Sequence, residues 1–186
     1  MSEFFTALTD DHLSFITRQP MFFVATAAAE GRINLSPKGY DVVRVLGPTR
    51  IAYLDLGGSG NETQAHLAAD GRITLMFCAF DNPALILRVY GRGNFVIAGD
   101  PAYPALAARF PKLPGARQIF EIAVESVQTS CGWGVPKMTL DQPRETLVKY
   151  HRQADPEERL ARIADRTRSI DGLPVRVQTT LPAFDA

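Results

Sequence analysis

The sequence predicts a mainly β (α+β) domain, in which a barrel-like sheet is followed by helical additions. Some seven segments with strand character precede the C-terminal helical segments, whereas an alternating order would indicate a parallel βαβ sheet. One segment, residues 85–97, exceeds the usual strand length of about five or six residues and contains Gly91 and Gly93, which indicates a bend or bulge. Sharply bent strands allow small sheets to close into barrels. The 186 residues, 46% of them apolar, can form one core, so residues 1–186 are predicted to be a single domain.

The predicted strands are apolar or alternating runs between turn residues. Residues 21–27 are a continuous apolar run rich in β-formers, and Glu30-Gly31 makes a hairpin turn into the next strand. In chain order, the strands are expected at residues 21–27, 32–36, 41–46, 50–56, 72–80, 85–97 and 118–129. The barrel is therefore expected over about residues 20–136.

Capping residues predict the helices. Thr9 or Asp10 can cap a first helix, and Asn61 followed by Gln64 has the pattern of a capping box. The other helices are expected at residues 101–110, from 141 and from 155, so the C-terminal helices cover about 141–170 and the tail 175–186 is loosely held. The last helix carries Arg159, Arg162 and Arg166 on what is expected to be its solvated face.

Composition excludes several classes of protein. Lys plus Arg and Asp plus Glu both number 20, and this balance argues against a nucleic-acid binder. No apolar run is long enough to span a bilayer, no signal-peptide pattern is present, and neither Cys78 nor Cys131 requires a disulfide. The cytoplasm is therefore the expected compartment. The three histidines lack metal-ligand spacing, and no metal site is predicted.

A first candidate anion site lies at residues 33–40. Asn34 and Ser36 alternate with Ile33 and Leu35, and Pro37 is expected to end the strand because it has no N–H group. Lys38 follows directly. A hydroxyl and an ammonium at one strand end suit an oxyanion, most plausibly a phosphate, although an ordinary strand end with a surface lysine has the same pattern.

A second candidate anion site lies at residues 57–67, where three glycines precede a short helix. A glycine-rich loop that opens a helix presents free N–H groups and the positive end of the helix dipole. Ser59 and Thr63 add hydroxyl groups. The plain alternative is a capped helix after a flexible turn.

The order of these motifs resembles the pyridoxamine 5′-phosphate oxidase-related family, the FMN-binding split β-barrels. The resemblance rests on four short motifs and covers about residues 4–174. They are Asn34-Leu35-Ser36-Pro37-Lys38-Gly39, Ser59-Gly60-Asn61-Glu62-Thr63, Tyr90-Gly91-Arg92-Gly93 and Ser130-Cys131-Gly132-Trp133-Gly134-Val135-Pro136.

The resemblance implies a homodimer that holds FMN at the subunit interface. The implied cofactor-binding residues are Asn34, Ser36, Lys38, Ser59, Asn61, Thr63, Arg92 and Trp133. Lys38, Ser59 and Thr63 are the candidates for the phosphate, and Trp133 for covering the flavin rings or closing the pocket from the partner chain. Two departures stand out: Glu62 sits where relatives often have a basic residue, and the chain lacks the arginine-containing final segment of authentic vitamin-B6 oxidases.

Three functions remain open. The first is an FMN-dependent oxidoreductase that moves hydride between flavin N5 and a small organic substrate or nicotinamide. The second is a non-catalytic carrier or sensor of FMN or haem. Haem binding would require an axial ligand from His12, His66 or His151. The third is a dimeric scaffold without a cofactor, suggested by Glu62. The sequence does not separate FMN from a deazaflavin, and it names no catalytic residue.

Overall fold

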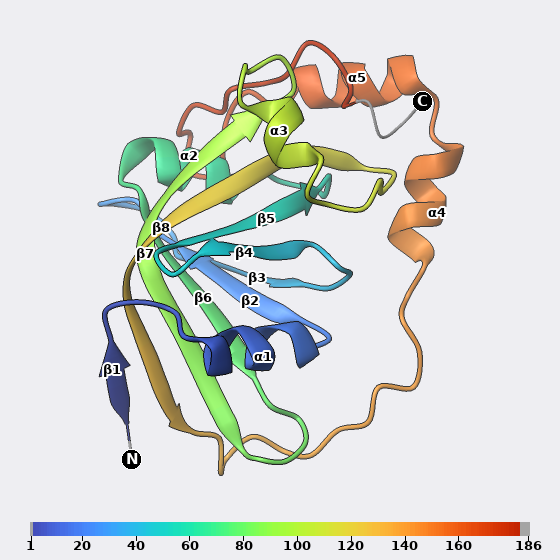
Figure 1. Cartoon of the computed structure of the whole chain (residues 1–186). Coiled ribbons are helices and arrows are strands. Elements are labelled where there is room, and N and C mark those ends of the chain that lie inside the picture. The colour runs from blue at the N-terminus through green and yellow to red at the C-terminus, as the bar shows by residue number, and fades with distance from the viewer. Residues whose placement is uncertain (1, 183–186) are drawn as a thin grey trace.

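A computed structural model of the chain describes residues 2–182, and in them eight strands form one antiparallel sheet. The hydrogen-bonded order is β3-β2-β6-β7-β8-β5-β4, with β1 also paired to β8. Figure 1 shows the sheet strongly curved. The strands are β1 (Glu3–Phe5), β2 (Phe22–Thr26), β3 (Asn34–Lys38), β4 (Val43–Gly47), β5 (Arg50–Leu56), β6 (Arg72–Cys78), β7 (Leu85–Ile97) and β8 (Ala116–Cys131). The mainly β prediction is confirmed, and β1 is a strand that it missed.

The bend expected in the long strand is present. β7 covers residues 85–97 as predicted, and its register with β8 shifts between Tyr90 and Gly91. A Cβ atom on Gly91 would lie 2.1 Å from the carbonyl oxygen of Ala123. Glycine therefore allows β7 and β8 to approach closely at this irregularity.

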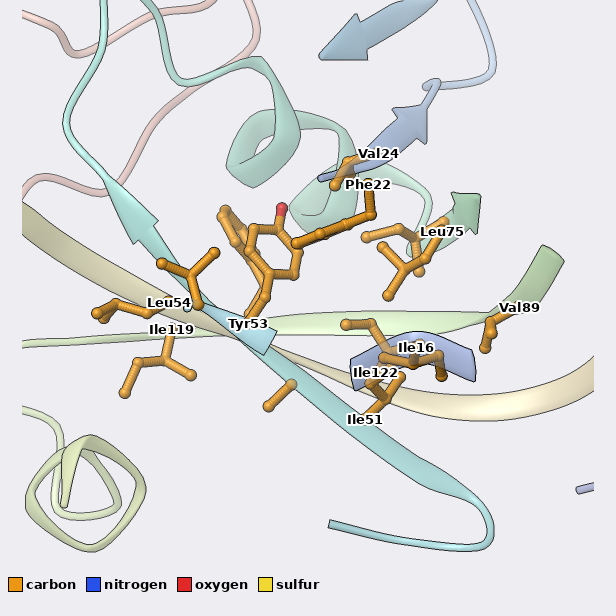
Figure 2. Packing of buried hydrophobic residues seen from close by; sticks show 14 of the residues in the cluster. Ile16, Phe22, Val24, Ile51, Tyr53, Leu54, Leu75, Val89, Ile119 and Ile122 are labelled. Carbon is orange, nitrogen blue, oxygen red and sulfur yellow. The ribbon is translucent and has the colours of Figure 1, made fainter. Parts of the chain in front are cut away.

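The apolar core lies inside the curve of the sheet. Side chains from α1, β2, β5, β6, β7 and β8 form one cluster (Figure 2). Tyr53 lies near its centre, with ring centroids 5.7 Å from Phe22 and 5.0 Å from Phe120. These three rings join β2, β5 and β8, which are distant in the sequence.

β3 is an edge strand of the sheet, and this explains why one expectation was wrong. Pro37 does not end the strand: it pairs with Phe23 of β2, and β3 continues to Lys38. An edge strand tolerates proline because one side of its backbone has no ladder to complete. The alternation places Ile33 and Leu35 outward, where they are 77% and 64% exposed.

The helices agree with the prediction in position but not always in length. They are α1 (Asp10–Arg18), α2 (Glu62–Ala69), α3 (Tyr103–Ala107), α4 (Thr146–Gln153) and α5 (Pro156–Ala164). Thr9 caps α1 and Asp155 caps α5, as expected. α4 begins later than residue 141, and α5 ends well before residue 170. No helix among residues 2–182 is long and apolar enough to cross a membrane.

The first residues of the tail 175–186 are held more firmly than predicted. Val175 and Gln178 are buried, and the main-chain N–H of Arg176 donates to Gln64 Oε1 at 2.6 Å. The expectation of a loosely held tail was therefore wrong for residues 175–178. Its residues 183–186 lie outside the described residues.

Candidate functional site

A cavity of about 250 Å³ opens between the end of β3 and the loop that leads into α2. It is called the strand-end cavity below. Six of the eight residues predicted to bind a cofactor line it, namely Asn34, Ser36, Lys38, Ser59, Asn61 and Thr63. The two candidate anion sites, which are separate in the sequence, therefore form one site. β3 and the α2 loop face each other because α2 packs against β2, the neighbour of β3.

A buried charge cluster forms one wall of the strand-end cavity. Asp55 on β5 accepts from Lys38 Nζ at 3.1 Å and from Arg117 Nη2 at 2.6 Å. Burial of the Asp55 carboxylate opposes ionisation, but the charges of Arg117 and Lys38 and a hydrogen bond from Gln118 outweigh it, and the pKa of Asp55 falls to about 2. Two cations thus share one carboxylate, which gives this wall an excess of positive charge.

Asn61 lies at the start of α2, but its side chain does not cap the helix. Its Oδ1 atom instead accepts from Gln118 Nε2 at 2.7 Å. The predicted capping box was wrong. Gln64 is buried, and its Nε2 donates to Gln118 Oε1 at 2.7 Å instead of bonding to the start of the helix. These side chains tie α2 to β8 rather than closing the helix end.

Asn34 belongs to a hydrogen-bonded group that spans β3, β2 and α2. Its Nδ2 donates to Thr63 Oγ1 at 3.1 Å and to Thr26 Oγ1 at 3.3 Å. Thr26 in turn contacts Nδ1 of His66 at 3.1 Å. His66 is 1% exposed, so it supports the floor of the site and is not a surface histidine.

The Glu62 side chain lines the strand-end cavity and also holds the C-terminal part of the chain. Both carboxylate oxygens accept from the main-chain N–H of Ile170, each at 3.2 Å. This contact gives the carboxylate a partner away from β3. The departure noted in the sequence is therefore a structural link between α2 and the segment after α5.

Two predicted residues lie elsewhere. Arg92 on β7 donates to the Asp70 carbonyl oxygen at 2.8 Å and approaches Glu125 at 3.5 Å, outside the strand-end cavity. Trp133 is 85% exposed in the loop after β8 and does not line the cavity of its own chain. A contribution of Trp133 to the site of a partner chain stays a prediction.

Sequence reasoning missed Asp55 and Arg117. A signal for Asp55 was present, since it is a single charged residue near the end of the apolar strand β5. Arg117 directly precedes the predicted strand 118–129, and only the pairing of β5 with β8 brings it to Asp55. Among the described residues, no group of three His, Cys, Asp or Glu side chains could hold a metal ion.

The chain is similar in sequence to known proteins. The family model for pyridoxamine 5′-phosphate oxidase matches residues 8–131, which include the whole strand-end cavity. A curated relative, the pyridoxamine 5′-phosphate oxidase family protein ustO of Aspergillus flavus, is 41% identical over 151 residues, or 78% of this chain. The chain spans 61% of the length of that relative.

Solved structures confirm the split-barrel type of fold. A putative pyridoxamine 5′-phosphate oxidase of Lactobacillus delbrueckii superposes with a TM-score of 0.54 at 20% identity, covering 66% of this chain and 94% of that one. A variant of HupZ from Group A Streptococcus superposes with a TM-score of 0.51 at 22% identity, covering 66% of this chain and 98% of that one.

Proposed function

Because the chain belongs to the pyridoxamine 5′-phosphate oxidase family, we propose that it binds FMN in the strand-end cavity and acts as an FMN-dependent oxidoreductase. The observation that carries the proposal is the cluster of Lys38, Asp55 and Arg117. Its excess of positive charge is fixed beside the hydroxyl groups of Ser59 and Thr63. Such a wall suits the phosphate of a flavin mononucleotide.

The residues fit this cofactor in three respects. Lys38 and Arg117 supply charge, Ser36 and Ser59 supply hydroxyl donors, and the loop before α2 supplies main-chain N–H groups. Asp55 keeps both cations oriented, since each donates to one of its two oxygens. When bound, FMN supplies the hydride chemistry at its N5 atom, and the protein contributes position and charge. A small organic molecule or nicotinamide would be the redox partner.

We propose that a second chain completes the site. A volume of about 250 Å³ is below the range of roughly 300–1,000 Å³ usual for pockets that bury most of a ligand. An exposed apolar strip is formed by Ile33, directly before the edge strand β3, and by Leu35 within that strand. We propose that this strip is part of a homodimer interface and that Trp133 of each chain approaches its partner's site. The cytoplasm remains the proposed compartment.

The haem alternative has less support from the site. Among residues 2–182, no histidine lines the strand-end cavity. His66 contacts Thr26, His12 Nδ1 accepts from the main chain of Thr9, and His151 Nε2 contacts the Gly57 carbonyl oxygen. A flavin needs no axial ligand, so the residues present favour it.

The proposal is tested by calorimetric titration of flavin-free protein with FMN. The visible spectrum and the mass of any chromophore released from the purified protein identify a cofactor that is bound from the start. The native protein is expected to bind FMN, and Lys38→Met to bind it at least tenfold more weakly. Arg50→Met is the control, because Arg50 lies on the exposed side of β5 and pairs with Glu121. Absence of flavin binding by the native protein would overturn the proposal.

A further inference from the structure

A second cavity, of about 320 Å³, lies between the C-terminal helices and the end of the barrel. It is called the helix-side cavity below. Figure 1 shows α4 and α5 beyond the ends of β5, β7 and β8. The helix-side cavity shares Gly58, Ser59, Asn61 and Arg117 with the strand-end cavity, so the two adjoin along this wall.

The helix-side cavity is rich in arginine. Five arginines line it, and among the described residues no acidic side chain does. They are Arg117, Arg159, Arg162, Arg166 and Arg176. Carboxylates that pair with some of these arginines lie outside the lining: Arg117 pairs with Asp55, Arg162 with Glu158 and Arg176 with Asp100. The lining itself is therefore positive.

The sequence predicted a solvated face for Arg159, Arg162 and Arg166. Arg162 and Arg166 are exposed as predicted, and the prediction was wrong for Arg159. Arg159 is 7% exposed and donates to the Ala116 carbonyl oxygen at 2.9 Å. Arg166 donates to the carbonyl oxygen of Gly58. A carbonyl has no net charge, so this contact orients Arg166 without cancelling its charge. Fixed guanidinium groups of this kind suit a carboxylate, which they can bind through two parallel hydrogen bonds.

A buried amide adds a second, independent sign of a ligand. Gln178 is 3% exposed and lines the helix-side cavity. Neither its Nε2 donor nor its Oε1 acceptor has a hydrogen-bond partner among the residues that the structure describes. Buried polar groups of proteins are nearly always paired. A ligand that offers both an acceptor and a donor would satisfy this amide.

One part of the remaining wall is apolar. Ile97 of β7, Leu147 of α4, Ile163 of α5 and Val175 contribute to it. Together with a volume at the lower end of the usual range for small-molecule pockets, this wall indicates a compact ligand with an apolar body.

We propose that the helix-side cavity binds a small organic carboxylate that has an apolar body and a hydroxyl or amide N–H group. The carboxylate pairs with Arg162 and Arg166, and the N–H or O–H group donates to Gln178. The shared wall places this ligand beside the strand-end cavity. Its assignment as a substrate rests on the proposed function.

The test uses hippurate, which has a phenyl ring, an amide N–H group and a carboxylate. Its neutral counterpart hippuramide lacks only the negative charge. Binding to the flavin-free full chain is measured by ligand-observed NMR titration up to millimolar concentrations. Hippurate is expected to bind at least tenfold more tightly than hippuramide. No saturable binding of hippurate, or equal binding of the two compounds, would overturn the proposal.

Two variants locate the binding. Arg166→Met and Arg162→Met are each expected to weaken hippurate binding about tenfold, the usual effect of losing one charge-assisted hydrogen bond. Arg50→Met should leave it unchanged, because Arg50 lies outside both cavities. Circular dichroism melting confirms that each variant is folded. Unchanged affinity in both folded arginine variants contradicts the assignment.

The Lys38→Met variant distinguishes the carboxylate site from the proposed flavin function. Lys38→Met is expected to reduce FMN binding and to leave hippurate binding intact, since Lys38 lines only the strand-end cavity. Hippurate binding without FMN binding would refute the flavin function and keep the carboxylate site. Strict competition between FMN and hippurate would show that the cavities form a single site, and would overturn the inference.

Discussion

Lys38 Nζ lies 3.1 Å from Asp55 Oδ1, and this ion pair joins the edge strand β3 to β5, which are not neighbours in the sheet. Asp55 is 2% exposed and also holds Arg117. The cluster therefore combines two roles. It links separate parts of the curved sheet, and it places a net positive charge on one wall of the strand-end cavity, whose lining also includes the Glu62 carboxylate.

Replacement of Asp55 should destabilise the fold. Asp55→Asn retains the shape of the side chain but leaves Lys38 and Arg117 with no shared counter-charge. Removal of one partner from a buried ion pair is expected to lower the free energy of unfolding by about 3 kcal/mol at neutral pH. Urea denaturation measures this quantity. If Asp55→Asn lowered the free energy of unfolding no more than the surface variant Glu121→Gln does, the assigned role of the buried cluster would be wrong.

The stability conferred by Asp55 should depend on pH in a defined window. Its pKa is about 2 in the folded chain and close to 3.8 when unperturbed. A lowered folded pKa gives stability that is complete above the unfolded value and is lost as pH falls through the folded value, an effect of roughly 2 kcal/mol. The difference in stability between the native protein and Asp55→Asn should therefore shrink between about pH 4 and pH 2. A constant difference across that window would contradict the ionised state of Asp55.

Neutralising Glu62 should tighten FMN binding. Glu62→Gln removes a negative charge from the wall of the strand-end cavity but keeps an oxygen that can accept from Ile170 N. We expect FMN affinity to rise about threefold at low salt, with a smaller gain at high salt because ions screen the interaction. Calorimetric titration at two ionic strengths measures both effects. Equal affinity of variant and native protein would mean that the carboxylate does not influence the phosphate.

Substitution of Gly91 should disrupt the junction of β7 and β8. A Cβ atom there would overlap the Ala123 carbonyl oxygen, so Gly91→Ala requires the backbone to move. We expect a loss of about 2–3 kcal/mol, as for overpacked interiors. The matched control is Gly47→Ala, because no atom lies within 4 Å of a Cβ at Gly47. Thermal unfolding compares the two, and equal melting temperatures would contradict the close approach.

Disruption of the apolar strip on β3 should separate the proposed dimer. Leu35→Lys places a charge at a side chain that is 64% exposed in one chain, so folding of the chain itself should be little affected. Analytical ultracentrifugation is expected to show a dimer for the native protein and a monomer for the variant. Phe4→Lys, at an exposed apolar residue of β1, is the control. A dimer that survives Leu35→Lys would place the interface elsewhere.

Local patterns predicted the strands well because alternation and turn residues report directly on the backbone. The limits of β7 follow from its uninterrupted run between Pro83 and Gly99. The sequence patterns also predicted anion-binding groups in residues 33–40 and 57–67. The meeting of these two segments in one cavity could not be derived, because it depends on the order of strands in the sheet.

The errors arose where distant contacts replaced local ones. Asn61 and Gln64 have the pattern of a capping box, but both side chains bond to Gln118 instead. Spacing also placed Arg159 on a solvated face, yet this arginine is buried and donates to the Ala116 carbonyl oxygen at the start of β8. Spacing along a helix does not reveal that the helix covers a cavity.

The C-terminal segment holds the glycine-rich loop at several points. His151 contacts the Gly57 carbonyl oxygen, Arg166 donates to Gly58, and Glu62 and Gln64 accept from the main chain of Ile170 and Arg176. All four C-terminal residues lie after residue 131, where the family match ends. Residues outside the family match therefore help to fix the glycine-rich loop, together with Arg117 of β8, which donates to the Gly60 carbonyl oxygen. Substitutions in the C-terminal segment are therefore expected to alter this loop more than the pairing of the strands in the sheet.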